Sequence, residues 1–184
     1  TDMRGAAVGA GRSINLVLTK RGMRALRILG LAETVLQLTV PVYGRMLHDV
    51  QGNLTYTAYG KDDGEKNHSV GRGDLNIALL DAGEAAGIPI HFELGLETAD
   101  LSQPDSVTLT FSGPQGERRE TTARAFGADG AGSRLRAALL EHTGGESETE
   151  WCDGYKEFFI DSGTYEIYTM DERSLHIWPR GRQF

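Results

Sequence analysis

Residues 13–38, SINLVLTKRGMRALRILGLAETVLQL, change from the pattern of a β-strand to the pattern of a helix. In the first six residues, Ile14, Leu16 and Leu18 alternate with other side chains, which is the two-residue period of a half-buried strand. From residue 20 onward, apolar side chains recur every three or four residues, with an interruption at Gly30. A strand that leads directly into a helix indicates an α/β fold.

The rest of the chain continues to mix strands and helices. Residues 40–50 and 54–59 are extended runs joined by Gln51-Gly52-Asn53, a turn triplet that predicts a hairpin. Residues 74–86 have helical spacing and are followed by Gly87 and Pro89, which end a helix. Similar patterns predict strands over residues 90–96, 106–111, 117–126, 155–160, 166–170 and 174–178, a helix over residues 133–142, and turns over residues 61–66 and 113–116.

This order of elements predicts an α/β layer followed by the start of a β-rich layer. The chain begins on a loop and stops just after a strand, so we expect an internal piece of a longer protein. Val8-Gly9-Ala10-Gly11 does not complete the dinucleotide fingerprint G-x-G-x-x-G, because Ile14 occupies the third glycine position and no apolar strand precedes the motif. A glycine loop is the expected structure there.

Composition excludes several classes of protein. The formal charge of -7, from 26 acidic and 19 basic side chains, argues against nucleic acid as a partner. A single cysteine, Cys152, can form neither an internal disulfide nor a thiolate zinc site, which fits a reducing compartment. No apolar run is long enough to span a bilayer. We therefore expect a cytoplasmic location and no membrane segment in this piece.

Four segments, in this order, resemble the kynurenine 3-monooxygenase family of FAD-dependent aromatic hydroxylases. They are GRSINL at residues 11–16, GRMLH at 44–48, GADG at 127–130 and LHIWPR at 175–180. Shorter matches are Ala58-Tyr59-Gly60, residues 69–72 and residues 154–157, so the resemblance covers nearly the whole chain. It implies an α/β fold: an incomplete Rossmann-like FAD-binding domain of the aromatic-hydroxylase type with the start of a β-rich substrate domain.

The resemblance also implies a division of the chain. Residues 1–40 and 67–143 would belong to the FAD-binding domain, whose N-terminal fingerprint is missing. Residues 41–66 would form a β-hairpin that contributes to the substrate site, and residues 144–184 would start the substrate-domain sheet. The pyrophosphate cradle would precede Thr1, so we expect the isolated chain neither to hold FAD tightly nor to turn over.

Two residues are implied to bind the substrate. Arg45 would pair with the amino-acid carboxylate of L-kynurenine, because a planar guanidinium binds a carboxylate through two parallel hydrogen bonds. Tyr59 would support the same carboxylate with its hydroxyl. Considered without the family, the favoured interpretation is that Arg45 is an ordinary surface arginine and Tyr59 an ordinary packing residue, so these roles depend on the resemblance.

Five residues are implied to contact the cofactor. Asn15 and Leu16 would line the flavin ring, and Arg72 would lie beside the flavin, where a cation counters phosphate or reduced-flavin charge. Asp129 and Gly130 would lie near the flavin pyrophosphate and take part in FAD and NADPH contacts. Solvent exposure for Arg72, core packing for Leu16 and a structural turn at residues 127–130 remain the alternatives.

The implied reaction uses NADPH to reduce FAD, after which molecular oxygen forms a flavin C4a-hydroperoxide that converts L-kynurenine to 3-hydroxykynurenine. No catalytic side chain is required, and the spacing of the histidines offers no metal site. His48, His176 and Trp178 are therefore expected to be structural. The alternatives are another FAD-dependent aromatic hydroxylase or reductase of the same fold, and a non-catalytic ligand-binding module.

Overall fold

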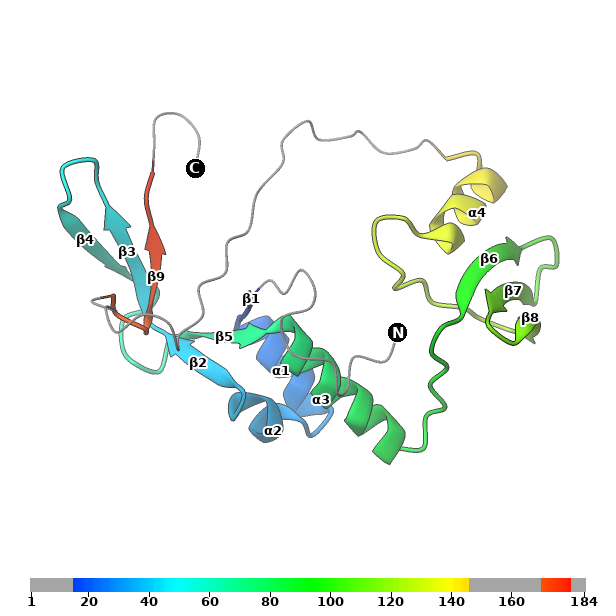
Figure 1. Ribbon diagram of the computed structural model, residues 1–184, viewed down its shortest axis with the longest axis horizontal. Coiled ribbons are helices and arrows are strands. Elements are labelled where there is room, and N and C mark those ends of the chain that lie inside the picture. The colour runs from blue at the N-terminus through cyan, green and yellow to red at the C-terminus, as the bar shows by residue number, and fades with distance from the viewer. Residues whose placement is uncertain (1–14, 146–169, 180–184) are drawn as a thin grey trace. The chain divides into compact units, whose positions relative to one another are not determined.

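The computed structural model describes residues 15–145 and 170–179 (Figure 1). The chain divides into two compact units. The described part of the first unit comprises residues 15–90 and 170–179, and that of the second unit comprises residues 91–145. Each unit has its own sheet structure, so each is considered separately.

The first unit contains a three-stranded sheet in the order β1-β5-β2, with β1 at Asn15–Leu18, β5 at Asn67–Gly71 and β2 at Thr39–Val42. Both outer strands run antiparallel to β5. Two short helices, α1 (Lys20–Ile28) and α2 (Ala32–Leu36), connect β1 to β2, and the break between them is Gly30 at φ +73°. Glycine adopts this left-handed conformation without steric cost, so the helical pattern is interrupted where the sequence predicts.

The core of the first unit lies between this sheet and its helices. Val35 of α2 and Val70 of β5 are almost fully buried, at 1% and 2% exposed. α3 (Arg72–Ala85) begins directly after β5 and adds Leu75 to the same cluster. The remaining buried members are Met23, Leu26 and Ala32. Burial of these side chains joins the helices to the central strand.

A second sheet of the first unit has the order β4-β3-β9, with β4 at Leu54–Ala58, β3 at Gly44–His48 and β9 at Ser174–Ile177. β3 and β4 form the predicted hairpin, and Asp49 holds its turn. The Asp49 carboxylate accepts hydrogen bonds from the amides of Gln51 and Asn53, at 2.9 and 2.7 Å. The Asn53 side chain donates a further hydrogen bond to this carboxylate at 2.7 Å. That bond is the main reason why the pKa of Asp49 is lowered, and the bonds from the amides add to the effect. Parallel pairing of β3 with β9 joins segments that are far apart in sequence.

The second unit consists of an antiparallel sheet and one helix. Strands β6 (Gly95–Asp100), β7 (Val107–Gly113) and β8 (Gly116–Thr122) follow one another in the sheet, and α4 (Arg134–Thr143) packs against β6. Ser133 caps the N-terminus of α4 by accepting a hydrogen bond from the Arg136 amide, and Gly144 ends the helix at φ +67°. Serine caps and left-handed glycines are the expected signals at these two positions.

Several sequence predictions are confirmed, one predicted strand is wrong and one is shorter than predicted. The predicted strand over residues 90–96 is mainly a loop, because Glu93 has φ +58° and bends the chain; β6 starts at Gly95 instead. The predicted strand over residues 117–126 ends at Thr122. The extended run over residues 40–50 is two strands, β2 and β3, in different sheets. Predicted strand 155–160 and residues 166–169 lie outside the described residues.

Candidate functional site

Arg45 and Tyr59 lie together on the β3-β4 hairpin. The guanidinium carbon of Arg45 is 5.5 Å from the centre of the Tyr59 ring, within the range of a cation–π contact. Arg45 is exposed, whereas Tyr59 is half-buried. The structure therefore brings together two residues that are 14 positions apart in sequence and were predicted to share a ligand.

The backbone explains why these two side chains meet. Arg45 pairs with Thr57 across the hairpin, and the Tyr59 amide donates a hydrogen bond to the Tyr43 carbonyl at 2.8 Å. Side chains two residues apart on a strand share a face, so Thr57 and Tyr59 project on the same side as Arg45. Next to Arg45, a Cβ on Gly44 would lie 2.5 Å from the Thr57 carbonyl oxygen, so the close strand contact requires glycine.

The other face of this sheet carries an aromatic cluster of His48, His176 and Trp178. The His48 and Trp178 rings stack with centroids 4.2 Å apart, and His48 Nε2 lies 2.8 Å from His176 Nδ1. His176 Nε2 is 2.9 Å from the carbonyl oxygen of Asp171, which can only accept, so Nε2 donates this hydrogen bond. These contacts join β3 to β9 behind Arg45, as expected for structural residues.

Three of the predicted cofactor residues meet at one end of the first sheet. Asn15 and Leu16 of β1 lie opposite Gly71 and Val70 of β5, and Arg72 follows as the first residue of α3. The N-cap of α3 is Gly71, which provides no side-chain cap for the helix amides. Arg72 therefore adds a positive charge at the N-terminus of α3, where Asp74 places a carboxylate in the first turn.

Asp129 and Gly130 lie in the loop before α4. Ser133 Oγ donates a hydrogen bond to Asp129 Oδ1 at 2.6 Å, and this bond is the main reason why the pKa of Asp129 is lowered. Gly130 has φ +81°, and its carbonyl and that of Ala131 accept hydrogen bonds from the Arg136 guanidinium. The loop therefore presents an ionised, exposed carboxylate in a defined turn.

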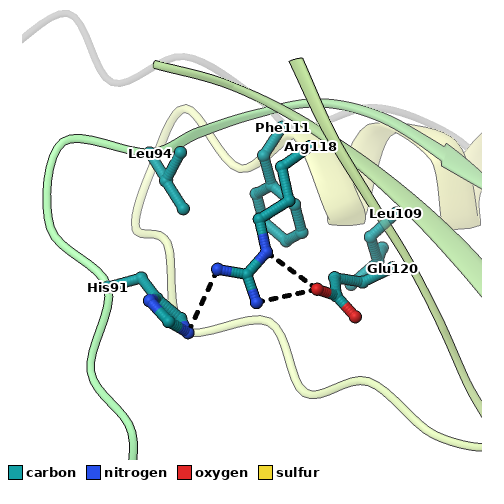
Figure 2. Close-up of a pocket in the computed structure, with 6 residues that line it drawn as sticks. All are labelled: His91, Leu94, Leu109, Phe111, Arg118 and Glu120. Carbon is teal, nitrogen blue, oxygen red and sulfur yellow. Dashed lines mark hydrogen bonds and ion pairs between the residues drawn. The ribbon is translucent and has the colours of Figure 1, made fainter. Parts of the chain in front are cut away.

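The second unit also contains a cavity of about 310 Å³ that none of the predicted site residues line (Figure 2). Arg118 lies between the His91 ring and the Glu120 carboxylate, with Nε and Nη2 each 2.7 Å from Glu120 Oε1. Leu94, Leu109 and Phe111 supply its apolar surface. Glu120 balances the charge of Arg118. This cavity is therefore less suited to an anionic ligand than the surface around Arg45.

A pair that sequence reasoning missed is Tyr43 with Lys66. Lys66 Nζ lies 5.1 Å from the centre of the Tyr43 ring and 3.5 Å from its hydroxyl oxygen. Tyr43 is two residues before Arg45 in the predicted extended run, which is the signal that could have linked the two residues. The contact of Lys66 could not be predicted, because residues 61–66 were predicted to be a turn exposed to solvent.

The part of the chain that the structure describes contains neither a metal-binding cluster nor a helix that could span a membrane. Within residues 15–145 and 170–179, no group of three or more His, Cys, Asp or Glu side chains is arranged to hold a metal ion. Over the same residues, none of the helices combines the length and apolar character needed to cross a membrane.

Comparison of the sequence with known proteins identifies close relatives. The chain is 39% identical over 183 residues to kynurenine 3-monooxygenase of Myxococcus xanthus, and 39% identical over 184 residues to that of Xanthomonas oryzae pv. oryzae. These alignments cover 98% of this chain but 39% and 40% of the relatives, so the chain spans about two fifths of their length. No family model matches the chain.

Comparison of the structure gives the fold. The chain is similar to p-nitrophenol 4-monooxygenase of Pseudomonas putida, with TM-score 0.59 and 18% identity over 67% of this chain and 32% of that one. It is also similar to anhydrotetracycline hydroxylase of Streptomyces rimosus, with TM-score 0.58 and 21% identity over 69% and 26% of the two chains. Aklavinone-11 hydroxylase, solved with FAD and aklavinone, gives TM-score 0.57 and 24% identity over 70% and 27%. The fold predicted from the sequence, part of an aromatic-hydroxylase α/β architecture, is confirmed.

Proposed function

We propose that this chain, a homologue of the kynurenine 3-monooxygenases along nearly its whole length, is part of an FAD-dependent monooxygenase that hydroxylates L-kynurenine to 3-hydroxykynurenine. The observation that carries the proposal is the contact between Arg45 and Tyr59. The resemblance assigns these two residues to one substrate carboxylate, and they lie on one hairpin within reach of a common ligand. NADPH and molecular oxygen are the proposed co-substrates.

In this proposal Arg45 and Tyr59 bind and orient the substrate. Within the described residues Arg45 has no carboxylate partner, so its guanidinium is available for the carboxylate of an amino acid. The face of the Tyr59 ring contacts the guanidinium, which leaves the phenol hydroxyl at the ring edge to donate a second hydrogen bond. Two fixed donors would hold the carboxylate end of the substrate in one position and so orient its aromatic ring, which lowers the entropic cost of reaction.

The residues that would hold FAD fit parts of that molecule. Arg72, at the N-terminus of α3, suits an anionic phosphate or reduced flavin, and the amide side chain of Asn15 supplies donors and an acceptor beside it. The ionised Asp129 would repel a phosphate but accepts hydrogen bonds from hydroxyl groups, so its role would be to bind a sugar or ribityl hydroxyl.

FAD supplies the redox chemistry when it is bound, taking electrons from NADPH and activating oxygen for transfer to the aromatic ring. The side chains of this chain are then needed to position the substrate and to exclude water. In this division of labour Arg45 supplies the contact with the carboxylate, and no side chain has to act as a nucleophile or base.

The proposal is tested on the natural-length protein that contains this chain, purified with FAD. We expect L-kynurenine to stimulate NADPH oxidation and a product 16 mass units heavier to form, the mass of one oxygen atom. Incubation under ¹⁸O₂ should place the label in this product. NADPH oxidation that L-kynurenine does not stimulate, with no hydroxylated product, would contradict the proposal.

The 184-residue chain alone is expected to bind FAD weakly and to be inactive, because it spans only about two fifths of its relatives' length. Stoichiometric flavin in the purified chain, with kynurenine-dependent NADPH oxidation, would overturn this expectation. A cytoplasmic location remains an expectation that rests on the single cysteine of the sequence.

A further inference from the structure

Lys66 and Tyr43 form a second pair of a cation with a tyrosine beside Arg45 and Tyr59. The Lys66 ammonium lies over the Tyr43 ring, 5.1 Å from its centre, and 3.5 Å from the phenol oxygen. Both residues are half-buried. The two pairs are adjacent along the backbone, because Tyr59 donates its amide proton to the Tyr43 carbonyl at 2.8 Å.

The sheet registers explain why Lys66 meets Tyr43. In the β2-β5 ladder Val42 lies opposite Asn67, so the next position places Tyr43 opposite Lys66. Cross-strand neighbours have Cβ atoms about 5 Å apart, which is close enough for a lysine to cover a tyrosine ring. Tyr43 is thus the point where the β2-β5 ladder ends and the β3-β4 hairpin begins.

The backbone holds both residues of this pair. The Tyr43 amide donates to the carbonyl of Arg173 at 2.9 Å, so Tyr43 is bonded to the segments before β9 and after β4. Lys66 follows a loop closed by Glu65, whose carboxylate accepts a hydrogen bond from the Lys61 amide at 2.9 Å. Gly60 allows the loop to close, because a Cβ there would lie 2.0 Å from the Glu65 Cβ. The backbone that leads into Lys66 is therefore part of a closed loop.

The two cations of this region are not engaged by carboxylates in the part of the chain that the structure describes. Over residues 15–145 and 170–179, neither Lys66 nor Arg45 forms an ion pair with a carboxylate. The loop that precedes Lys66 carries three acidic side chains: Asp62 accepts from the Gly64 amide, Glu65 accepts from the Lys61 amide, and Asp63 is exposed. Two cations held against two neighbouring tyrosines, without acidic partners, favour an anionic ligand.

We propose that Lys66, held against Tyr43, is a second positioning residue for the carboxylate of the substrate, beside Arg45. The inference rests on the proposed function and deepens it, since it makes the site selective for substrates that carry a carboxylate. Arg45 supplies the planar, bidentate contact, and Lys66 supplies a point charge that attracts the same group. Its contribution is to binding and not to the chemical step.

The test compares Lys66→Met with wild type in the natural-length, FAD-loaded protein. Methionine keeps most of the length of the side chain and removes its charge. We expect KM and Kd for L-kynurenine to rise roughly threefold to fivefold, the usual effect of a partly exposed charge pair. The value of kcat should not change, because the interaction is equal in the ground state and the transition state.

Three comparisons separate this role from a structural one. The decarboxylated analogue of L-kynurenine, which keeps the aromatic ketone, should bind Lys66→Met and wild type equally. Lys66→Arg, which keeps the charge, should stay within about twofold of wild type. Lys61→Met removes an exposed lysine from the same loop and should have no effect on KM.

The outcomes distinguish the two proposals. If wild type does not bind or hydroxylate L-kynurenine, the proposed function fails. If wild type is active and Lys66→Met behaves like Lys61→Met, the inference about Lys66 fails and the function stands. A rise in KM that is equal for the decarboxylated analogue would also overturn the inference, because Lys66 would then act through the fold. Should Lys66→Met unfold, Lys66→Gln gives the same comparison.

Discussion

At the scale of single residues, Gly44 is what allows Arg45 to occupy its place beside Tyr59. Gly44 is buried, and the Tyr56 ring and the Thr57 carbonyl lie where its Cβ would be, at 2.6 and 2.5 Å. No L side chain fits unless strand β4 moves. The position of Arg45 thus depends on the lack of a side chain at the residue before it.

Gly44→Ala should therefore destabilise the hairpin by about 1–3 kcal/mol, the usual cost of overpacking, and weaken L-kynurenine binding with it. Urea unfolding and a kynurenine titration measure the two effects. Gly95→Ala is the matched control, because nothing lies within 4 Å of a Cβ at that position. Equal stability of the two variants would show that the close strand contact is not required.

Ser133 is the second residue whose effect can be isolated. Its hydroxyl accepts from the Arg136 amide at 3.0 Å and donates to Asp129 at 2.6 Å. Ser133→Ala should cost about 1 kcal/mol through loss of the helix cap. It should also raise the pKa of Asp129, because the hydrogen bond that most favours the ionised carboxylate is removed.

Amide exchange of α4 and an NMR titration of the Asp129 carboxyl check this pair of effects. Thr143→Ala is the control, since it removes a hydroxyl that bonds the Leu139 carbonyl at the other end of α4. An unchanged Asp129 pKa in Ser133→Ala would refute the assigned cause.

At the scale of elements, most of the fold could be predicted from the sequence. The helices and the hairpin have clear periodicity and turn residues, and they are found close to the expected positions. β5 could not be predicted, because Val70 is the one apolar side chain in residues 67–71 with a large surface to bury. The prediction of a strand over residues 90–96 was wrong for the opposite reason. The apolar side chains there alternate as in a strand, but most of these residues lie in a loop: Ile90, Phe92, Leu94 and Leu96.

The unpredicted strand β5 is central to the first unit, so its core residue should matter. Val70→Ala should lower the free energy of unfolding by about 2 kcal/mol, since Val70 is 2% exposed and packed in the main cluster. Val17→Ala on the neighbouring strand β1 is the control, because Val17 is 50% exposed. Equal loss of stability in the two variants, measured by urea unfolding, would contradict the position of β5.

His68 of β5 gives a pH dependence with a defined sign. Its pKa lies below the ordinary value, first because of burial and then because of the charges of Lys66 and Arg27. His68 therefore binds a proton more readily in the unfolded chain than in the folded one. The contribution of His68 to stability is lost as pH falls below about 6.5, the ordinary histidine pKa. Thr39 Oγ1 donates to the Leu36 carbonyl, so it accepts a hydrogen bond from His68 Nδ1, 3.2 Å away.

We expect His68→Asn to lose less stability than wild type between pH 7.5 and pH 5.5, because asparagine does not titrate. Urea unfolding at the two pH values, followed through amide exchange of β5, gives the comparison. Identical losses in the two proteins would show that His68 does not contribute to the pH dependence.

At the scale of the whole molecule, the candidate site residues fall in both units. Arg45, Tyr59, Asn15, Leu16 and Arg72 belong to the first unit, and Asp129 and Gly130 to the second. The resemblance predicted each of these roles, whereas general residue patterns did not, because an isolated arginine or tyrosine has no distinctive spacing. What the structure adds is local geometry: Arg45 contacts Tyr59, and Asn15, Leu16 and Arg72 lie at one end of a sheet.

The central claim is that Arg45 binds the carboxylate of L-kynurenine, and the most direct measurement is the Kd of L-kynurenine for Arg45→Ala. In the natural-length, FAD-loaded protein we expect this Kd to rise roughly tenfold to hundredfold, as for loss of a charged hydrogen bond, with flavin content unchanged. Arg24→Ala, which removes an exposed arginine of α1, should bind like wild type. If Arg45→Ala binds L-kynurenine as tightly as wild type, the assignment of the carboxylate site is wrong.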